Sequence, residues 1–242
     1  MSDPVVLVTG AARRIGAVIA SHFHQSGYRV ILHYNHSHSE ALSLCEDLEA
    51  IRPNSAVLLQ ADLIQTTDWD VLLEQSLSHW GCVDVLINNA SSFYPTPIGT
   101  INEDAWQDLM GSNLRAPLFL SQAFAPTLKI AKGSIINIID IHGRKPLKNH
   151  PVYSISKAGL AMLTHSLAKE LAPEVRVNGI SPGSIVWPEA TLSEDRKTKI
   201  LEEIPLGRQG NKEDIAETAL FLANSAYITG QIINVDGGRS LT

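Results

Sequence analysis

Three residues near the middle of the chain carry functional groups that can hold or move protons: Asp140, Tyr153 and Lys157. Tyr153 and Lys157 are four residues apart in a helix-forming stretch, so they share one face of that helix. Asp140 follows the apolar run 134–139, a predicted buried strand, and its side chain is expected at the carboxyl tip of that strand. Open parallel sheets bind ligands in crevices at such tips. The spacing therefore predicts a ligand crevice equipped for proton transfer.

A turn that suits a phosphate group follows the first predicted strand. Residues 9–16 read TGAARRIG and lie between a short β-branched run and a helix-forming stretch. Glycine lets the backbone come close to a pyrophosphate, and a helix N-terminus offers free N–H groups and the positive end of its dipole. We therefore predict dinucleotide contacts from Gly10, Arg14, Ile15 and Gly16, with an ordinary tight turn as the alternative.

The stretch after the second predicted strand has no acidic residue. In a protein that binds NAD, an Asp or Glu at this place holds the ribose 2′-hydroxyl. Here the residues are His33, Tyr34, Asn35, His36 and Ser37. A missing carboxylate removes repulsion toward a 2′-phosphate, and Arg14 could reach over to pair with that group. The sequence therefore predicts NADPH rather than NADH, bound with an affinity that depends on pH through the histidines.

Small or polar residues follow three more predicted strands, as expected where a cofactor lies along one edge of a sheet. They are Asp62 and Leu63 after the third strand, Asn89, Ala90 and Ser91 after the fourth, and Pro182, Gly183 and Ser184 after the sixth. We assign the first pair to the adenine edge, the second group to close backbone approach, and the third to the carboxamide and phosphates. Each group alone is also compatible with a simple turn.

Apolar runs and amphipathic stretches alternate along the whole chain. The predicted strands cover residues 5–8, 30–33, 56–59, 83–87, 134–139, 176–180 and 231–235. The predicted helices cover residues 15–26, 40–51, 69–80, 103–128, 152–171 and 212–224, with an irregular stretch before the last of them. This alternation indicates a parallel sheet covered on both faces. We expect an α/β, doubly wound Rossmann-type sheet of about seven strands, in a single domain over 1–242 with a substrate loop at about 182–205.

Composition excludes several classes of partner. The net charge of −6 and the dispersed basic residues offer no basic surface for nucleic acid. Cys45 and Cys82 occur in no ligand spacing, so neither a disulfide framework nor a metal site is expected. No apolar run is long enough to span a membrane, and the N-terminus lacks the pattern of a signal peptide. We therefore expect a soluble, cytoplasmic protein.

Taken together, these motifs resemble the short-chain dehydrogenase/reductase family over the whole chain. The matching residues are the 9–16 turn, Asn88 to Ala90, Asn113, Tyr153 and Lys157, Pro182 and Gly183, and the segment 235–238. The resemblance implies that Tyr153 donates a proton, that Lys157 holds the nicotinamide ribose and lowers the pKa of Tyr153, and that Asn113 organises a relay water. A phenol, with a pKa of about 10, needs a nearby ammonium to work near neutrality.

Three departures from the general pattern of that family look like the pteridine reductases. Arg14 replaces the usual middle glycine of the turn, Asp140 replaces the usual serine, and residues 91–97 read SSFYPTP. In that subfamily the phenylalanine of this loop, here Phe93, sandwiches a flat pterin against the nicotinamide. Ring stacking favours a planar substrate by about 0.5–1.5 kcal/mol beyond burial. The alternative for Phe93 is a loop aromatic buried in the core.

An aspartate at position 140 suits a pterin better than a ketone. A serine hydroxyl donates to a ketone oxygen that gathers negative charge, whereas a pterin presents ring nitrogens and an amino group. Asp140 can accept from that amino edge or, when protonated, help deliver a proton to a ring nitrogen; a helix N-cap is the alternative role. The expected reaction is hydride transfer from NADPH to a dihydropterin or dihydrofolate ring. The residues expected around the substrate are Arg14, Ser91, Phe93, Asp140, Tyr153 and Trp187.

Two other functions stay open from the sequence. One is a carbonyl reductase of the same family that acts on 3-oxoacyl thioesters, and the other is a non-catalytic NADPH-binding sensor. The resemblance also implies small-molecule partners and a homotetramer built through the helices at 103–128 and 152–171.

Overall fold

A single parallel sheet organises the computed structural model, which describes residues 3–187 and 193–242. Its seven strands lie in the order β3-β2-β1-β4-β5-β6-β7. They are β1 (Val5–Val8), β2 (Arg29–Tyr34), β3 (Ala56–Gln60), β4 (Val85–Asn88), β5 (Ser134–Ile138), β6 (Arg176–Pro182) and β7 (Ile232–Val235). The chain builds outward from β1 in one direction and from β4 in the other, so the order switches between these two strands. The predicted α/β fold is confirmed, with its ligand crevice expected at that switch.

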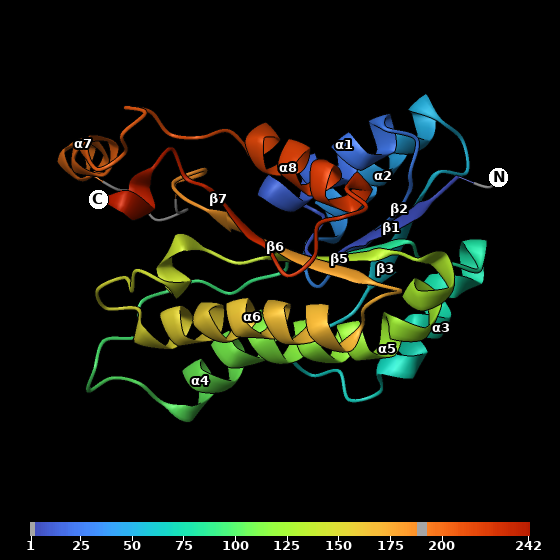
Figure 1. Cartoon of the computed structure of the whole chain (residues 1–242), viewed down its shortest axis with the longest axis horizontal. Coiled ribbons are helices and arrows are strands. Elements are labelled where there is room, and N and C mark those ends of the chain that lie inside the picture. Colours follow the sequence, from blue (N-terminus) through green and yellow to red (C-terminus); the bar gives the residue numbers. More distant parts are fainter. Residues whose placement is uncertain (1–2, 188–192) are drawn as a thin grey trace.

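Helices cover both faces of the sheet (Figure 1). One face carries α1 (Arg14–Gln25), α2 (His38–Ile51) and α8 (Lys212–Asn224). The other carries α3 (Trp69–Trp80), α4 (Glu103–Met110), α5 (Ala116–Ala131) and α6 (Pro151–Glu170). Along β1, Val6 and Val8 pack into the first core while Val5 and Leu7 pack into the second. Successive side chains of a strand point to opposite faces, which is why a fully apolar strand serves two cores.

The helix predicted at 103–128 is not one regular α-helix. α4 leads through a π-helical turn, η1 (Gly111–Arg115), into α5. Pro117 lies in the first turn of α5 and has no N–H for an i→i−4 bond, so a regular α-helix cannot pass through this point. The widened turn carries Asn113, whose side chain reaches α6.

The segment after β6 contains a helix where the sequence predicted an irregular stretch, and that part of the prediction is wrong. α7 (Glu194–Glu202) begins after Ser193, whose side chain accepts from the Arg196 N–H. None of its residues is buried, so it has no apolar stripe to indicate a helix. Residues 188–192 of the predicted substrate loop lie outside the described residues.

Within residues 3–187 and 193–242, no helix is both long and apolar enough to cross a membrane. The same residues contain no group of three or more His, Cys, Asp or Glu side chains placed to hold a metal ion.

Candidate active site

The three predicted proton-transfer residues meet beyond the carboxyl end of β5. The Tyr153 hydroxyl donates to Asp140 Oδ2 at 2.7 Å. Lys157 lies one turn further along α6, with its Nζ 5.7 Å from the centre of the Tyr153 ring. That ammonium donates to the Ile138 carbonyl oxygen at 3.0 Å. Tyr153 and Lys157 are only 4% and 2% exposed, so phenol, carboxylate and ammonium form a largely buried cluster.

Asp140 uses its two carboxylate oxygens for different contacts. Oδ2 accepts from Tyr153, and Oδ1 accepts from the His142 N–H at 2.8 Å. The second contact caps the short 3-10 helix η2 (Ile141–Gly143). The N-cap, which the sequence left as an alternative role, is therefore present together with the contact to the phenol. Because the backbone holds one oxygen, the other is kept at a fixed place beside Tyr153.

The electrostatics of the cluster differ from what the family resemblance implies. Burial, followed by the charge of Asp140, raises the pKa of Tyr153 well above its ordinary value. Burial lowers the pKa of Lys157 to about 8, and Asp140 opposes that shift. The resemblance has Lys157 lowering the pKa of Tyr153, but here the phenol donates to an anion and the ammonium donates to a carbonyl. Tyr153 therefore stays protonated at neutral pH, with its proton directed toward Asp140.

Asn113 connects the 91–97 loop to α6. Its Nδ2 donates to the Ser92 carbonyl at 3.0 Å and to Ser156 Oγ at 3.1 Å, while its Oδ1 accepts from the Ser92 N–H at 3.0 Å. Ser156 Oγ donates in turn to the Tyr153 carbonyl at 2.7 Å. Asn113 thus reaches Tyr153 through Ser156 and positions the loop. The two serines were not candidates from the sequence, because single serines carry no signal until the fold brings them together.

Phe93 lies beside the cluster of Asp140, Tyr153 and Lys157. Its ring centre lies 4.8 Å from that of Tyr153 at an interplanar angle of 78°. His150, the residue before α6, stacks on Phe93 at 5.0 Å and 13°. Phe93 is 43% exposed, so it is not the core aromatic that the sequence left as an alternative. The His150 stack was missed from the sequence, since nothing in the spacing pairs residue 93 with residue 150.

The turn after β1 is packed too closely for side chains at its glycines. Gly10 has φ +63°, and a Cβ there would lie 3.0 Å from Ala90 Cα. A Cβ on Gly16 would lie 2.2 Å from the Gly10 carbonyl oxygen. Buried Thr9 accepts from the N–H groups of Asn89 and Ala90 at 2.9 and 3.0 Å. The structure therefore brings the predicted residues of the turn and of the segment after β4 together.

The N-terminus of α1 fits a phosphate group. No side chain caps it, and its first turn has no acidic residue. Its free N–H groups and dipole favour an anion such as a pyrophosphate. Arg14, with φ +55°, extends from this turn and donates through Nη2 to the Trp187 carbonyl at 3.1 Å. That contact brings the predicted substrate residues Arg14 and Trp187 together beyond the end of β6. It directs the guanidinium of Arg14 away from the end of β2, where the 2′-phosphate was expected.

His33 contacts the backbone of the turn after β1 and does not offer a positive charge to a cofactor. Its Nδ1 accepts from the Gly10 N–H at 3.2 Å, so its Nε2 carries the proton and donates to the Ala61 carbonyl at 3.2 Å. Burial lowers its pKa to about 4. The ring is therefore neutral at physiological pH and gives no positive charge to a 2′-phosphate, whereas His36 is exposed.

The other predicted cofactor residues lie at or just after the carboxyl ends of their strands. They are Tyr34, Asn35, His36 and Ser37 at β2, Asp62 and Leu63 at β3, Ser91 at β4, and Pro182, Gly183 and Ser184 at β6. Three of these side chains are buried, namely Tyr34, Leu63 and Pro182, and Ile15 packs against the core. Asp62 Oδ1 accepts from the Ile64 N–H at 2.9 Å and shapes the segment after β3.

The fold and site together define a nicotinamide-dependent oxidoreductase, and comparison with known proteins agrees. A family model described as enoyl-(acyl carrier protein) reductase matches residues 10–240. The chain is 40% identical to pteridine reductase 1 of Leishmania tarentolae, over 99% of this chain and 97% of the relative. It is 36% identical to the 3-oxoacyl-[acyl-carrier-protein] reductase FabG of Staphylococcus epidermidis, over 96% of this chain and 97% of the relative. The chain belongs to the short-chain dehydrogenase/reductase family and is an oxidoreductase.

Proposed function

We propose that the protein is an NADPH-dependent pteridine reductase that reduces the ring of a dihydropterin or dihydrofolate. The observation that carries this proposal is the exposed ring of Phe93 beside the Tyr153–Asp140 pair. A flat, nitrogen-rich ring can stack on Phe93 while its polar edge meets the phenol and the carboxylate. The 40% identity to pteridine reductase 1 supports the same substrate class.

The residues of the cluster divide the work of proton transfer. Bound NADPH supplies the hydride. Tyr153 is protonated at neutral pH, and it delivers its proton to a ring nitrogen of the substrate. Asp140 orients the phenol and accepts from the amino edge of the pterin. Lys157 would bind the ribose with the N–H groups that its hydrogen bond to the Ile138 carbonyl leaves over.

Support for NADPH over NADH lies between β2 and α2. No carboxylate occurs among residues 33–37, and no side chain caps the N-terminus of α2. Arg13 forms an ion pair with Glu40 in the first turn of α2, at 3.9 Å, which brings a guanidinium to this place. A 2′-phosphate here would meet the guanidinium and the positive end of the α2 dipole, and it would compete with Glu40 for Arg13. Arg13 was not predicted, because residue 13 and α2 are neighbours only in the fold.

We also propose a homotetramer in the cytoplasm. The side chains of Trp106, Leu118, Ile155 and Met162 are exposed on α4, α5 and α6 although they are large and apolar. Apolar side chains gathered on one set of helices favour association between copies of the chain.

Substitution of Asp140 tests the proposed chemistry. In D140S the hydroxyl can still meet Tyr153, but no carboxylate meets the amino edge of the pterin. We expect kcat with dihydrobiopterin to fall about 100-fold, with the Kd for NADPH changed by less than about 2-fold. D140N is the matched control, since it keeps the size and an oxygen for the cap on His142 while removing the charge. Unchanged turnover in D140S would contradict the role given to this carboxylate.

A spectrophotometric assay with NADPH and NADH over a substrate panel separates the candidate functions. The panel contains dihydrobiopterin, dihydromonapterin, dihydrofolate and an acetoacetyl thioester. The 36% identity to FabG favours the thioester as second candidate. If NADPH is oxidised only in the presence of the thioester, the protein is a carbonyl reductase and the proposal is wrong. If NADPH binds but no compound in the panel oxidises it, the protein is a non-catalytic NADPH-binding sensor. If NADH is oxidised faster than NADPH, the cofactor assignment is wrong.

A further inference from the structure

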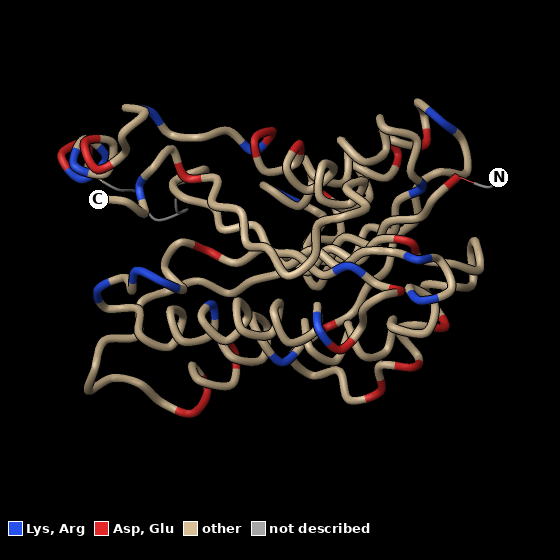
Figure 2. Tube along the Cα trace, viewed as in Figure 1, with Lys and Arg blue, Asp and Glu red and all other residues tan. Residues whose placement is uncertain are grey.

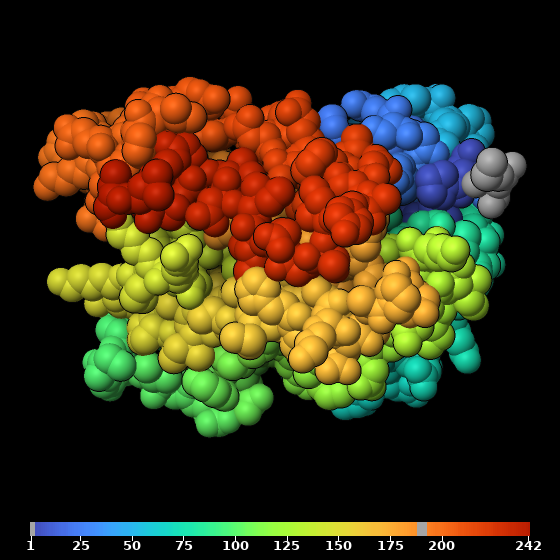
Figure 3. All heavy atoms as spheres, in the orientation of Figure 1, coloured from blue at the N-terminus to red at the C-terminus, as the bar shows by residue number. Residues whose placement is uncertain are grey.

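The segment between Asp140 and α6 is strongly basic in an acidic protein. The chain carries a net charge of −6, yet it has no acidic residue between Asp140 and Glu170. Residues 141–150, which we name the basic loop, carry Arg144, Lys145 and Lys148, and all three are exposed. Figure 2 shows these cations as blue segments at the left of the view, and in Figure 3 the same loop projects outward from the molecule.

The basic loop is attached to the substrate side of the catalytic cluster. Asp140 stands directly before it, and Tyr153 lies three residues after its end. Its last residue, His150, stacks on Phe93, and the carbonyl of Asn149 accepts from the Thr96 N–H at 2.7 Å. Lys148 is two residues from His150, so their Cα atoms are at most about 7 Å apart. A tail leaving a ring stacked on Phe93 toward this loop would therefore meet its cations.

The charges of the basic loop are available to a ligand. Among the described residues, no acidic side chain forms an ion pair with Arg144 or Lys148. Lys145 differs, because its ammonium donates to the Thr242 carbonyl oxygen. The other described segments around the site do not share this charge. The 91–102 segment has no charged residue, and α7 carries three acidic and three basic residues.

The 2′-phosphate of the cofactor does not account for these cations. The basic loop follows β5, whereas the residues assigned to the 2′-phosphate follow β2. Strands β1 and β4 separate β2 from β5 in the sheet. The basic loop therefore lies away from the expected 2′-phosphate and, through His150, beside Phe93, where the substrate ring is proposed to stack.

We propose that the basic loop binds an anionic tail of the substrate and makes the enzyme favour a pterin with a carboxylate-bearing tail over one with a neutral polyol tail. This inference rests on the pteridine reductase function proposed above. Each exposed cation contributes weakly, but two on one loop can shift affinity several-fold at low salt. The contacts act on the tail, so they change KM and leave the chemical step at the ring unaltered.

The test compares two substrates that share the ring and differ in the tail. Dihydrofolate carries the carboxylates and dihydrobiopterin carries a neutral tail. In R144Q/K148Q we expect the KM for dihydrofolate to rise about 3- to 10-fold at low salt, with kcat unchanged and the KM for dihydrobiopterin within about 1.5-fold. Salt of about 0.5 M should raise the wild-type KM for dihydrofolate and have little effect in the variant. Lys145 is left in place because of its contact with Thr242.

The control variant K129Q/K169Q removes the same charge at two exposed lysines near the ends of α5 and α6, on the amino edge of the sheet. It should leave both KM values unchanged. The inference would be overturned if R144Q/K148Q changed the KM for both substrates equally, or if the control variant raised the KM for dihydrofolate by the same factor. The reductase function would stand in either case. If the wild-type protein reduces neither pterin, the proposed function itself fails. The inference would also be overturned if the protein reduced only a 3-oxoacyl carrier-protein thioester and R144Q/K148Q weakened that reaction. The basic loop would then bind an acidic carrier protein.

Discussion

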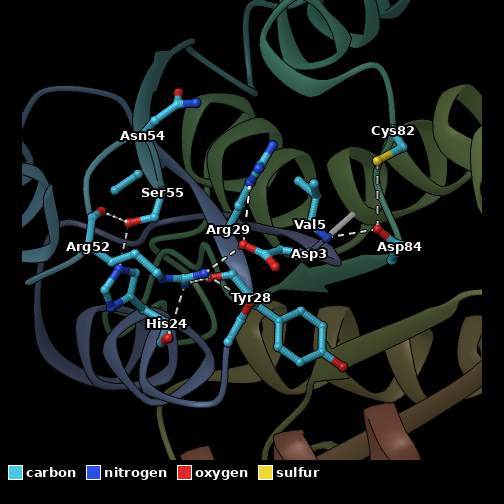
Figure 4. A network of polar contacts seen from close by, with 12 residues as sticks. Asp3, Val5, His24, Tyr28, Arg29, Arg52, Asn54, Ser55, Cys82 and Asp84 are labelled. Atoms are coloured by element: carbon cyan, nitrogen blue, oxygen red, sulfur yellow. Dashed lines mark hydrogen bonds and ion pairs between the residues drawn. The ribbon is translucent and has the colours of Figure 1, made fainter. Parts of the chain in front are cut away.

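Polar networks lie at both ends of the strands: one where the strands begin, the amino edge of the sheet, and one where they end, the carboxyl edge. The two networks use their hydrogen-bonding groups differently. At the amino edge, Arg52 donates to Asp3 and to the carbonyl oxygens of His24, Gly27 and Tyr28 (Figure 4). At the carboxyl edge, the Lys157 ammonium has three N–H groups but makes one hydrogen bond among the described residues, to the Ile138 carbonyl.

The amino edge is satisfied mainly by its own backbone. Glu49 accepts three backbone N–H groups, from Asn54, Ser55 and Ala56, and Asp84 accepts the Val5 N–H at 2.7 Å. Such a network closes the ends of helices and strands and leaves little capacity for a ligand. The carboxyl edge keeps a buried ammonium, a phenol and a carboxylate with capacity to spare, which is the condition of a site that binds and reacts. The difference predicts that substitutions at the carboxyl edge change turnover and that substitutions at the amino edge change stability.

The largest expected effect lies at the carboxyl edge. Y153F removes the hydroxyl proposed to deliver the proton and keeps the ring against Phe93. We expect kcat with a dihydropterin to fall about 1,000-fold, because proton transfer by a positioned group contributes about 10²- to 10⁴-fold. The Kd for NADPH and the urea midpoint should stay close to the wild-type values. A fall in stability with little loss of turnover would break the comparison between the two edges.

Two buried histidines, His33 at the carboxyl edge and His24 at the amino edge, allow the two edges to be compared through the pH dependence of stability. The pKa of His33 is about 4 in the folded protein and 6.5 when unperturbed, so the unfolded chain takes up the proton first as the pH falls. Stability from this group is therefore complete above pH 6.5 and is lost progressively down to about pH 4. Between pH 7 and pH 5 we expect the wild-type free energy of unfolding in urea to fall about 2 kcal/mol more than that of H33Q.

His24 provides the matched control for His33. Burial, followed by Arg52, lowers its pKa too, and its Nε2 pairs with Ser55 Oγ at 2.7 Å. H24Q should therefore also weaken the loss of stability in acid, but it should leave NADPH binding unchanged. H33Q should weaken NADPH binding about 3- to 10-fold at pH 7, because Gly10 of the phosphate turn loses its acceptor. Equal NADPH affinity in the two variants would show that His33 does not support the cofactor edge.

Regular elements and local spacings could be predicted from the sequence. The bounds of β1, α3 and α8 agree with the predicted ranges, because apolar runs and amphipathic periods are local signals. Asp140, Tyr153 and Lys157 could be placed together since two of them share a helix face and the third ends a strand. The π-helical turn, α7 and the Arg14–Trp187 contact could not be predicted in the same way. They depend on neighbours that are remote in sequence or on a helix without a buried face.

The direction of the pKa shift of Tyr153 shows the same limit. A spacing of four residues predicts that Lys157 is near the phenol, but it does not say which partner the phenol contacts. In the structure that partner is Asp140, thirteen residues away, and burial together with this carboxylate raises the pKa of Tyr153 rather than lowering it. Likewise, His33 was a candidate for phosphate binding from its position after an apolar run. Its burial between Gly10 and Ala61 makes it a neutral support.

The smallest of these effects is expected at the amino edge, at Arg52. R52M keeps the aliphatic stem and removes the guanidinium, so the carbonyl oxygens of His24, Gly27 and Tyr28 lose their donor. Arg52 is partly exposed, so water replaces some of these contacts, and we expect the free energy of unfolding to fall by only about 1–2 kcal/mol. R52K, which keeps the charge but not the planar fork, should lose a similar amount because one ammonium cannot reach all these acceptors. For both variants, kcat and KM per folded protein should equal the wild-type values, since the network meets neither the cofactor edge nor Tyr153. A change in kcat at constant stability would mean that the two edges are coupled through the sheet, and the separation of stability from chemistry would then fail.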